Sequence, residues 1–177
     1  MTSFTPITSA SIIRNKIKDI PKQGGVYKQY VDSNGLKFLE GVHPSTFEII
    51  GNQKVYLLYI GRTKDLRDRF KSHLGFTNVS HGSITRGFIS TLRVSYMANH
   101  KDINHLSEQD KLNEFLDKYI YIQYMTTEDF VSIEEQLIEE NDLPLNIKGN
   151  QHPFVKMNKQ RRKEIKDRYK EYKLRHN

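Results

Sequence analysis

A continuous apolar run lies near the middle of the chain, VYLLYI at residues 55–60, and GRT follows it at once at residues 61–63. An uninterrupted apolar run of this length between polar neighbours favours a strand that is buried on both faces. In the residues that follow, leucine and phenylalanine recur at helical spacing. We therefore predict a buried strand that leads through a short glycine-containing turn into a helix over 64–74.

The same kind of pattern predicts further elements on both sides of this unit. They are a helix over 9–19, a strand over 24–31, a tight turn at 33–35 with a return strand over 36–39, a helix over 83–97, a helix over 107–117 that Ser107 caps, a strand over 119–125, and a helix that starts at Thr127 and ends before Pro144. Residues 93–96 fit an extended segment as well as a helix. Strands and helices alternate without a repeat, so we expect an α+β fold with a small sheet and several helices.

The positive charge of the chain is concentrated at its end. Lys and Arg number 28 and Asp and Glu 21, which gives a net charge of +7. Residues 151–177 hold ten basic and three acidic residues, so this segment carries the whole excess. Nucleic acid is the usual partner of such a segment, yet a solvated helix or an acidic protein partner fits the composition too. The candidate nucleic-acid contacts here are Arg161, Arg162, Lys163, Lys166 and Arg168.

Two absences restrict the classes of chemistry. The chain has no cysteine, which excludes disulfides, thiol nucleophiles, iron–sulfur clusters and cysteine-based zinc modules. It has no apolar run near the roughly 20 residues that a membrane helix needs, and no secretory signal at its start. We therefore expect a cytoplasmic protein that acts away from membranes.

Glu134 is a carboxylate in an apolar position of the helix predicted after Thr127. On a helical wheel it lies between Phe130 and Leu137 on one side and Ile138 on the other. A carboxylate on a buried face needs a cation, a hydrogen-bond network or a metal ion. A structural ion pair satisfies this need as well as a catalytic role does.

The helix over 64–74 has a similar anomaly. His73 falls on the same face as Leu66 and Phe70, and Arg69 lies one turn before it at the edge of that face. A lone histidine in such a position is commonly a satisfied core residue. A histidine paired with an arginine one turn away, directly after a strand, is less ordinary.

These residues resemble a known family, the GIY-YIG endonucleases. GVY at residues 25–27 looks like the first half of the family signature, and YIG at 59–61 is its second half, unaltered. In the family an arginine follows ten positions after the second tyrosine and a histidine or tyrosine fourteen after it. Arg69 and His73 stand at those two positions.

A late motif of the family is similar to EEQLI at residues 134–138, followed by Pro144 and Asn146. The resemblance then spans residues 21–147, which is most of the chain. The two half-signatures are weak alone, but all parts in order with their inner spacing make a specific match. The wheel and the family motif select the same three residues independently.

The resemblance implies a three-stranded antiparallel sheet flanked by helices, and a metal-dependent DNA endonuclease. It implies one divalent cation, Mg²⁺ or Mn²⁺, held by Glu134, and Arg69 as the ligand of the scissile phosphate. Tyr27 would take or position the proton of the attacking water, with Tyr59 beside it. His73 would relay a proton or orient Tyr27.

The chain departs from the family pattern at two points. Arg62 stands where many members have a lysine, and an arginine does not accept a proton, so Lys64 is the candidate replacement. The spacing between the signature tyrosines is long, so we predict an inserted hairpin within residues 28–54. Asn146 either ties its segment to the site or is an ordinary turn residue.

The remaining expectations concern the periphery of the site. Ser83, at the start of a predicted helix, and Arg86 are candidate phosphate contacts. We expect a nuclease domain over 1–150 and a basic helix over 151–177, acting on DNA and as a homodimer. The alternative from another class is a catalytically silent DNA- or RNA-binding module on the same scaffold.

Overall fold

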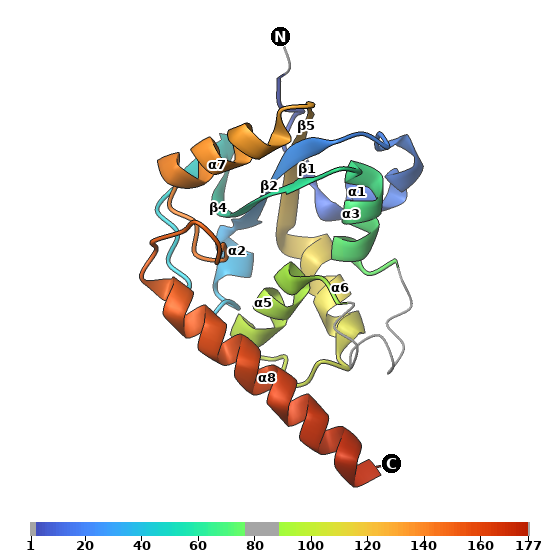
Figure 1. The fold of residues 1–177 in the computed structure, drawn as a ribbon, viewed down its shortest axis with the longest axis vertical. Helices are drawn as coiled ribbons and strands as arrows, with labels where there is room; N and C mark the ends of the chain where they lie inside the picture. Colours follow the sequence, from blue (N-terminus) through green and yellow to red (C-terminus); the bar gives the residue numbers. More distant parts are fainter. Residues whose placement is uncertain (1–2, 77–88, 177) are drawn as a thin grey trace.

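The computed structural model describes residues 3–76 and 89–176, apart from the side chains of residues 173 and 176. Its centre is an antiparallel sheet of the order β1-β5-β2-β4-β3, with helices on both faces (Figure 1). The strands are β1 (Thr8–Ser9), β2 (Gly25–Asp32), β3 (Phe47–Ile50), β4 (Gln53–Thr63) and β5 (Ile120–Thr126). The helices are α1 (Ala10–Asn15), the 3₁₀ helix η1 (Ile17–Asp19), α2 (Ser33–Leu36), α3 (Leu66–Leu74), α5 (Thr91–Asn99), α6 (Gln109–Tyr119), α7 (Phe130–Glu140) and α8 (Phe154–His176).

The three central strands are those that the apolar runs predict, and the α+β class is confirmed. The prediction of three strands is wrong, because two short strands extend the sheet at its edges. In the centre β2 pairs with β4 and β5, and this register sets Tyr27 directly opposite Gly61. The two halves of the signature therefore lie side by side in space.

The predicted hairpin turn at residues 33–35 is wrong. The carboxylate of Asp32 accepts hydrogen bonds from the backbone N–H groups of Asn34 and Gly35, at 2.9 and 2.7 Å. An aspartate in that position caps a helix, so the chain forms α2 in place of a tight turn. The antiparallel partner of β4 on this side is β3, and Ile50 pairs with Gln53 across their turn.

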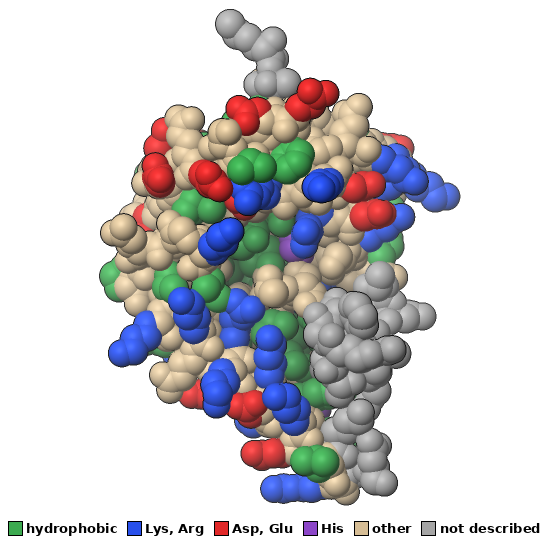
Figure 2. Space-filling model, in the orientation of Figure 1, with side chains coloured by type: hydrophobic (Ala, Val, Ile, Leu, Met, Phe, Trp, Pro, Cys, Tyr) green, Lys and Arg blue, Asp and Glu red, His purple; other side chains and the backbone are tan. Residues whose placement is uncertain are grey.

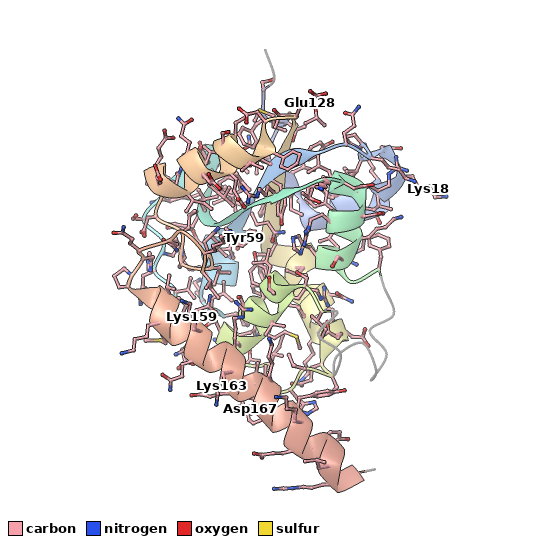
Figure 3. The ribbon with its side chains drawn as sticks, in the orientation of Figure 1. Lys18, Tyr59, Glu128, Lys159, Lys163 and Asp167 are labelled. Carbon is pink, nitrogen blue, oxygen red and sulfur yellow. The ribbon has the colours of Figure 1, made fainter. Side chains whose placement is uncertain are left out.

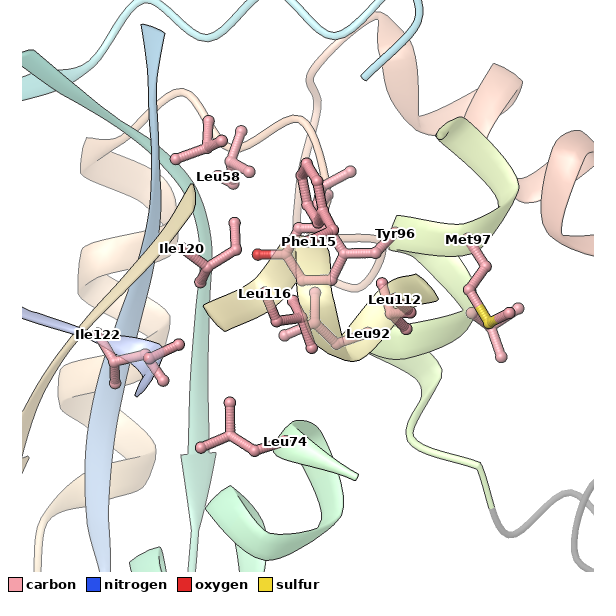
Figure 4. Close-up of a cluster of buried hydrophobic side chains, with 14 of the residues drawn as sticks. Leu58, Leu74, Leu92, Tyr96, Met97, Leu112, Phe115, Leu116, Ile120 and Ile122 are labelled. Atoms are coloured by element: carbon pink, nitrogen blue, oxygen red, sulfur yellow. The ribbon is translucent and has the colours of Figure 1, made fainter. Parts of the chain in front are cut away.

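One face of the sheet packs on α5 and α6 around a cluster of buried side chains (Figure 4). Its members come from the sheet and from three helices: Leu58, Ile120, Ile122, Leu74, Leu92, Tyr96, Phe115 and Leu116. A second cluster covers the other face, where Ile138 of α7 packs with Val26, Leu57 and Ile60. The sheet is thus fixed between two cores, which holds the ends of β2 and β4 in place.

The basic segment forms one long helix, α8, which packs on the body of the protein. It runs across the molecule below α5 (Figure 1). Its own residues Phe154, Ile165 and Tyr169 are buried against the body. Asn158 on its inner face is also buried and accepts a hydrogen bond from Asn99 of α5 at 3.0 Å. Among the described helices, none combines the length and apolar character needed to cross a bilayer.

Candidate active site

A chain of buried hydrogen bonds connects three elements at the centre of the fold. The hydroxyl of Tyr27 on β2 lies 2.6 Å from Nε2 of His73 on α3. Nδ1 of His73 lies 2.6 Å from the hydroxyl of Ser90, the residue before α5. Tyr27 is 1 %, His73 4 % and Ser90 8 % exposed, so water does not compete for these bonds.

The charges around His73 fix the direction of this chain. Burial, followed by the fields of Arg69 and Arg93, lowers the pKa of His73 to about 3, so its imidazole is neutral. Burial and the neighbouring Tyr59 raise the pKa of Tyr27 well above its usual value, so its hydroxyl keeps the proton. The Tyr27 O–H therefore donates to Nε2, and the Nδ1–H donates to Ser90.

The depressed pKa of His73 predicts a pH-dependent stability. Between about pH 6.5 and pH 3 the unfolded chain binds a proton at this residue and the folded chain does not. The free energy of unfolding should therefore fall on acidification, by about 1.4 kcal/mol per pH unit from this group. Urea unfolding at several pH values below 7 measures the slope of the unfolding free energy against pH. His73→Asn should lower this slope by the contribution of one proton, about 1.4 kcal/mol per pH unit.

His100 provides the control for this measurement. Burial lowers its pKa as well, but the side chain is only partly buried. His100→Asn should therefore change the slope less than His73→Asn does. Equal slopes for wild type and His73→Asn would contradict the assignment of a neutral, buried His73.

Gly61 makes room for both signature tyrosines. The rings of Tyr27 and Tyr59 lie 6.0 Å apart between centroids. A Cβ at Gly61 would stand 2.5 Å from the Tyr27 hydroxyl oxygen and 2.6 Å from Cε1 of Tyr59. Both contacts are too short for real atoms, so any side chain at Gly61 would displace the phenol that His73 holds.

Gly61→Ala is therefore expected to destabilise the fold by about 1–3 kcal/mol, which is the usual cost of overpacking a tight core. It should also break the hydrogen bond of Tyr27 to His73 and reduce activity. Urea unfolding measures the first effect. Gly51→Ala is the control, because nothing lies within 4 Å of a Cβ there and only its positive φ of 58° is strained. Wild-type stability of Gly61→Ala would contradict the close packing.

Glu134 projects from α7 into a pocket of about 480 Å³. Its carboxylate lies 3.3 Å from Nε of Arg62, and its side chain is 16 % exposed. Burial raises the pKa of the Glu134 carboxyl, and the Arg62 guanidinium opposes this shift. Tyr59 lines the same pocket, and Figure 3 places Tyr59 between α7 and α8.

The two cations after the signature glycine lie in different environments. Arg62 at the end of β4 extends toward α7, where it also contacts the carboxylate of Glu135 at 3.2 Å and the carbonyl of Val131 at 3.3 Å. Lys64 is exposed at the end of the strand. Arg62 is thus the partner of the acidic helix, and its charge acts on Glu134.

Arg69 is exposed on α3, and no carboxylate among the described residues lies within ion-pair distance of it. Its charge lowers the pKa of both Tyr27 and Tyr59 against the larger effect of burial. An arginine that is close to two phenols and carries no internal anion is available to an anionic ligand.

Asn146 completes the free edge of β4 beside the signature. Its side-chain oxygen accepts from the N–H of Ile60 at 2.9 Å, and its side-chain nitrogen donates to the carbonyl of Ile60 at 2.7 Å. The amide thus takes the place of a neighbouring strand where β3 has ended. Of the two roles left open for Asn146, the structure shows the tie to the strand.

The tail cations that the sequence groups together have separate surroundings. Arg161 is turned into the body, where it donates to the carbonyl of Glu40 at 2.6 Å. Lys163 pairs with Asp167 on the helix surface at 3.1 Å, while Lys166 and Arg168 are exposed. Lys and Arg side chains gather around the central hollow and along the part that α8 crosses (Figure 2). Ser83 and Arg86 lie outside the described residues.

Two contributing residues were not found by sequence reasoning. Ser90 falls inside the helix predicted over 83–97, but in the structure it precedes α5, and its hydroxyl makes no cap bond and contacts His73 instead. Arg93 is 1 % exposed and donates to the carbonyl of His73 at 2.9 Å, which fixes the end of α3. A fully buried arginine has no distinguishing signal within a helix of mixed composition.

One protein-family model, described as the GIY-YIG catalytic domain, matches residues 25–171. The match begins at the first residue of β2 and continues into α8, so it includes every residue of the site described above. A search of curated proteins and a search of solved structures found no match to the chain.

Proposed function

Because the chain belongs to the GIY-YIG family, we propose that it is a nuclease that hydrolyses phosphodiester bonds of DNA. One observation supports this most: the rings of Tyr27 and Tyr59 lie 6.0 Å apart between centroids, and the charges of Arg69 and Glu134, from two further elements, act on both phenols. The pKa values of both phenols respond to Arg69 and to Glu134. Side chains from such distant positions share a site only if the fold brings them together.

The donor set fits one hard divalent cation. Glu134 is a carboxylate in a pocket of mixed polar and apolar lining, and no cluster of three or more acidic or histidine ligands occurs among the described residues. Mg²⁺ suits a single carboxylate because it keeps several of its waters and shares the oxygens of a phosphate. Glu134 would hold Mg²⁺ or Mn²⁺, which when bound supplies Lewis-acid stabilisation of charge on the phosphate and the leaving oxygen.

The protein's own groups would bind the phosphate and move the proton. Arg69 would donate to the oxygens of the scissile phosphate in the fork geometry that guanidinium allows. Tyr27 would accept a proton from the attacking water as it passes its own proton to Nε2 of His73. This route replaces a free phenolate, which the raised pKa of Tyr27 disfavours. A phosphate on Arg69 offsets one of the two cations that oppose protonation of His73.

A substrate panel tests this function. Purified protein is incubated with supercoiled plasmid, linear duplex DNA and RNA, each with Mg²⁺, with Mn²⁺ and with a chelator, and the ends are mapped. We expect cleavage of DNA that requires the cation. Salt-sensitive binding of all three without cleavage would support the silent binding module instead. The homodimer stays a prediction, which light scattering on the purified chain would test.

The tail is proposed to contact phosphates through its exposed cations, Lys166 and Arg168. Removing α8 would not test this, because Ile165 and Tyr169 of this helix are part of the core and their loss would expose it. The double variant Lys166→Gln/Arg168→Gln keeps the helix. It should flatten the slope of log affinity against log salt by about 0.9 for each phosphate that the variant no longer neutralises.

Fluorescence anisotropy with duplex DNA at several salt concentrations measures this slope. Lys16→Gln/Lys18→Gln is the matched control, because it removes the same charge from exposed positions near η1, and Figure 3 shows Lys18 on the side away from α8. An unchanged slope in the tail variant would show that these residues do not touch DNA.

A further inference from the structure

The register of α8 is fixed by polar contacts as well as by its buried apolar residues. Besides its bond to Glu40, Nη1 of Arg161 donates to the side chain of Asn99 at 3.2 Å. Asn99 in turn donates to Asn158 of α8 at 3.0 Å, and Asn158 is fully buried. These bonds lock the rotation of the helix, so the direction of the next side chain along it is set by the fold.

That next side chain, Arg162, enters the pocket of the candidate active site. It lines the pocket together with Tyr59 and Glu134. Its charge is close enough to Tyr59 to lower the pKa of that phenol, as Arg69 does from α3. Two guanidinium groups from distant parts of the chain, Arg69 and Arg162, therefore act on Tyr59.

Within the described part of the chain, Arg162 has no partner that explains its position. Its Nε is buried and makes no hydrogen bond, and no carboxylate among the described residues lies within ion-pair distance of its guanidinium. Three acids line the pocket, of which Glu134 and Glu135 are engaged by Arg62, and Glu139 is exposed and does not pair with Arg162. Leaving a buried guanidinium N–H without an acceptor is unfavourable, so a merely structural arginine would be expected to have one.

We propose that Arg162 binds a phosphate oxygen of the substrate strand inside the active-site pocket. The buried Nε–H and the adjoining N–H groups then find an anionic acceptor, which none of residues 3–76 and 89–176 provides. This inference rests on the proposed nuclease function and adds to it. It makes α8 part of the active site, and it separates Arg162 from the exposed cations of the same helix, which meet DNA only from outside.

The Nε–H resonance of Arg162 offers a direct test that does not depend on cleavage. It is identified by its loss in Arg162→Lys and followed by NMR in the full chain with chelator present, while a short duplex or inorganic phosphate is added. We expect a saturable shift with both probes. An unshifted resonance at duplex concentrations that saturate binding would overturn the proposal.

Activity and stability of Arg162→Met give a second test. A charged hydrogen bond to phosphate predicts a loss of about 10- to 100-fold in single-turnover cleavage. The melting temperature should stay the same or rise, because an unsatisfied buried group is removed. Lys159→Met, an exposed change of the same charge on α8, should leave cleavage near wild type.

The outcomes separate this inference from the proposed function. A lower melting temperature for Arg162→Met with unchanged cleavage would assign Arg162 a structural role and overturn the inference while the nuclease stands. A shifted Nε–H resonance in a wild-type protein that cleaves nothing would keep the phosphate site and reject the nuclease.

Discussion

Replacing Glu134 with glutamine is expected to abolish cleavage while DNA binding persists. Glutamine keeps the size of the side chain but loses the charge that a divalent cation needs. Lewis-acid stabilisation is worth several kcal/mol, and each 1.36 kcal/mol is tenfold in rate, so the loss should reach about 1,000-fold or more. Single-turnover cleavage in Mg²⁺ measures it, and anisotropy measures binding.

Stability distinguishes this effect from a folding defect. Burial raises the pKa of the Glu134 carboxyl despite its contact with Arg62, so the fold disfavours the charged form. Glu134→Gln should therefore melt no lower than wild type. Glu139→Gln is the matched control, since Glu139 lines the same pocket on the same helix but is exposed. Wild-type cleavage by Glu134→Gln would remove Glu134 from the mechanism.

Replacing Tyr27 with phenylalanine is the second change with a large expected effect. The ring and its packing remain, but the hydroxyl that bonds Nε2 of His73 is lost. Removing a positioned proton relay typically costs about 100- to 10,000-fold in rate. The same single-turnover assay measures this loss, and circular dichroism confirms that the fold persists.

Tyr30→Phe is the matched control on the same strand. Both tyrosines are 1 % exposed, but Tyr30 lies three positions further along the strand and therefore points to the opposite face, where its hydroxyl bonds Gln123 at 3.0 Å. Each variant loses one buried hydrogen bond, worth about 1 kcal/mol. Their stabilities should therefore be similar and only Tyr27→Phe should lose activity. Equal activities would show that the Tyr27 hydroxyl has no part in the reaction.

The centre of the fold is predictable from the sequence because its signals are local. The apolar runs that became β2, β4 and β5 are long enough to indicate strands without tertiary information. The edge strand β3 has no such signal, since its Phe47 and Ile49 are 46 % and 61 % exposed and only the pairing with β4 makes it a strand. The predicted turn at Asn34 is wrong because the capping side chain of Asp32 outweighs the turn preference of the residues after it.

The residues of the candidate site also fall into two groups, those that the sequence indicates and those that only the packing reveals. Glu134 and His73 stand out in the sequence because a polar residue interrupts an apolar helical face. Ser90 and Arg162 do not, since a serine within a predicted helix has no distinguishing signal and an arginine in a basic segment resembles its neighbours. Only the packing of α5 and α8 against the body distinguishes these two residues.

The central claim is that the protein cleaves DNA by direct attack of water on the phosphate. Tracing the oxygen of the solvent into the products tests this claim most directly. DNA is cleaved by the wild-type protein with Mg²⁺ in water enriched in ¹⁸O, and the ends and the protein are analysed by mass spectrometry. Direct hydrolysis with a leaving 3′ oxygen predicts one ¹⁸O on each new 5′ phosphate and an unmodified protein. Intact DNA with every divalent cation, or a phosphate attached to Tyr27 or Tyr59, would contradict it.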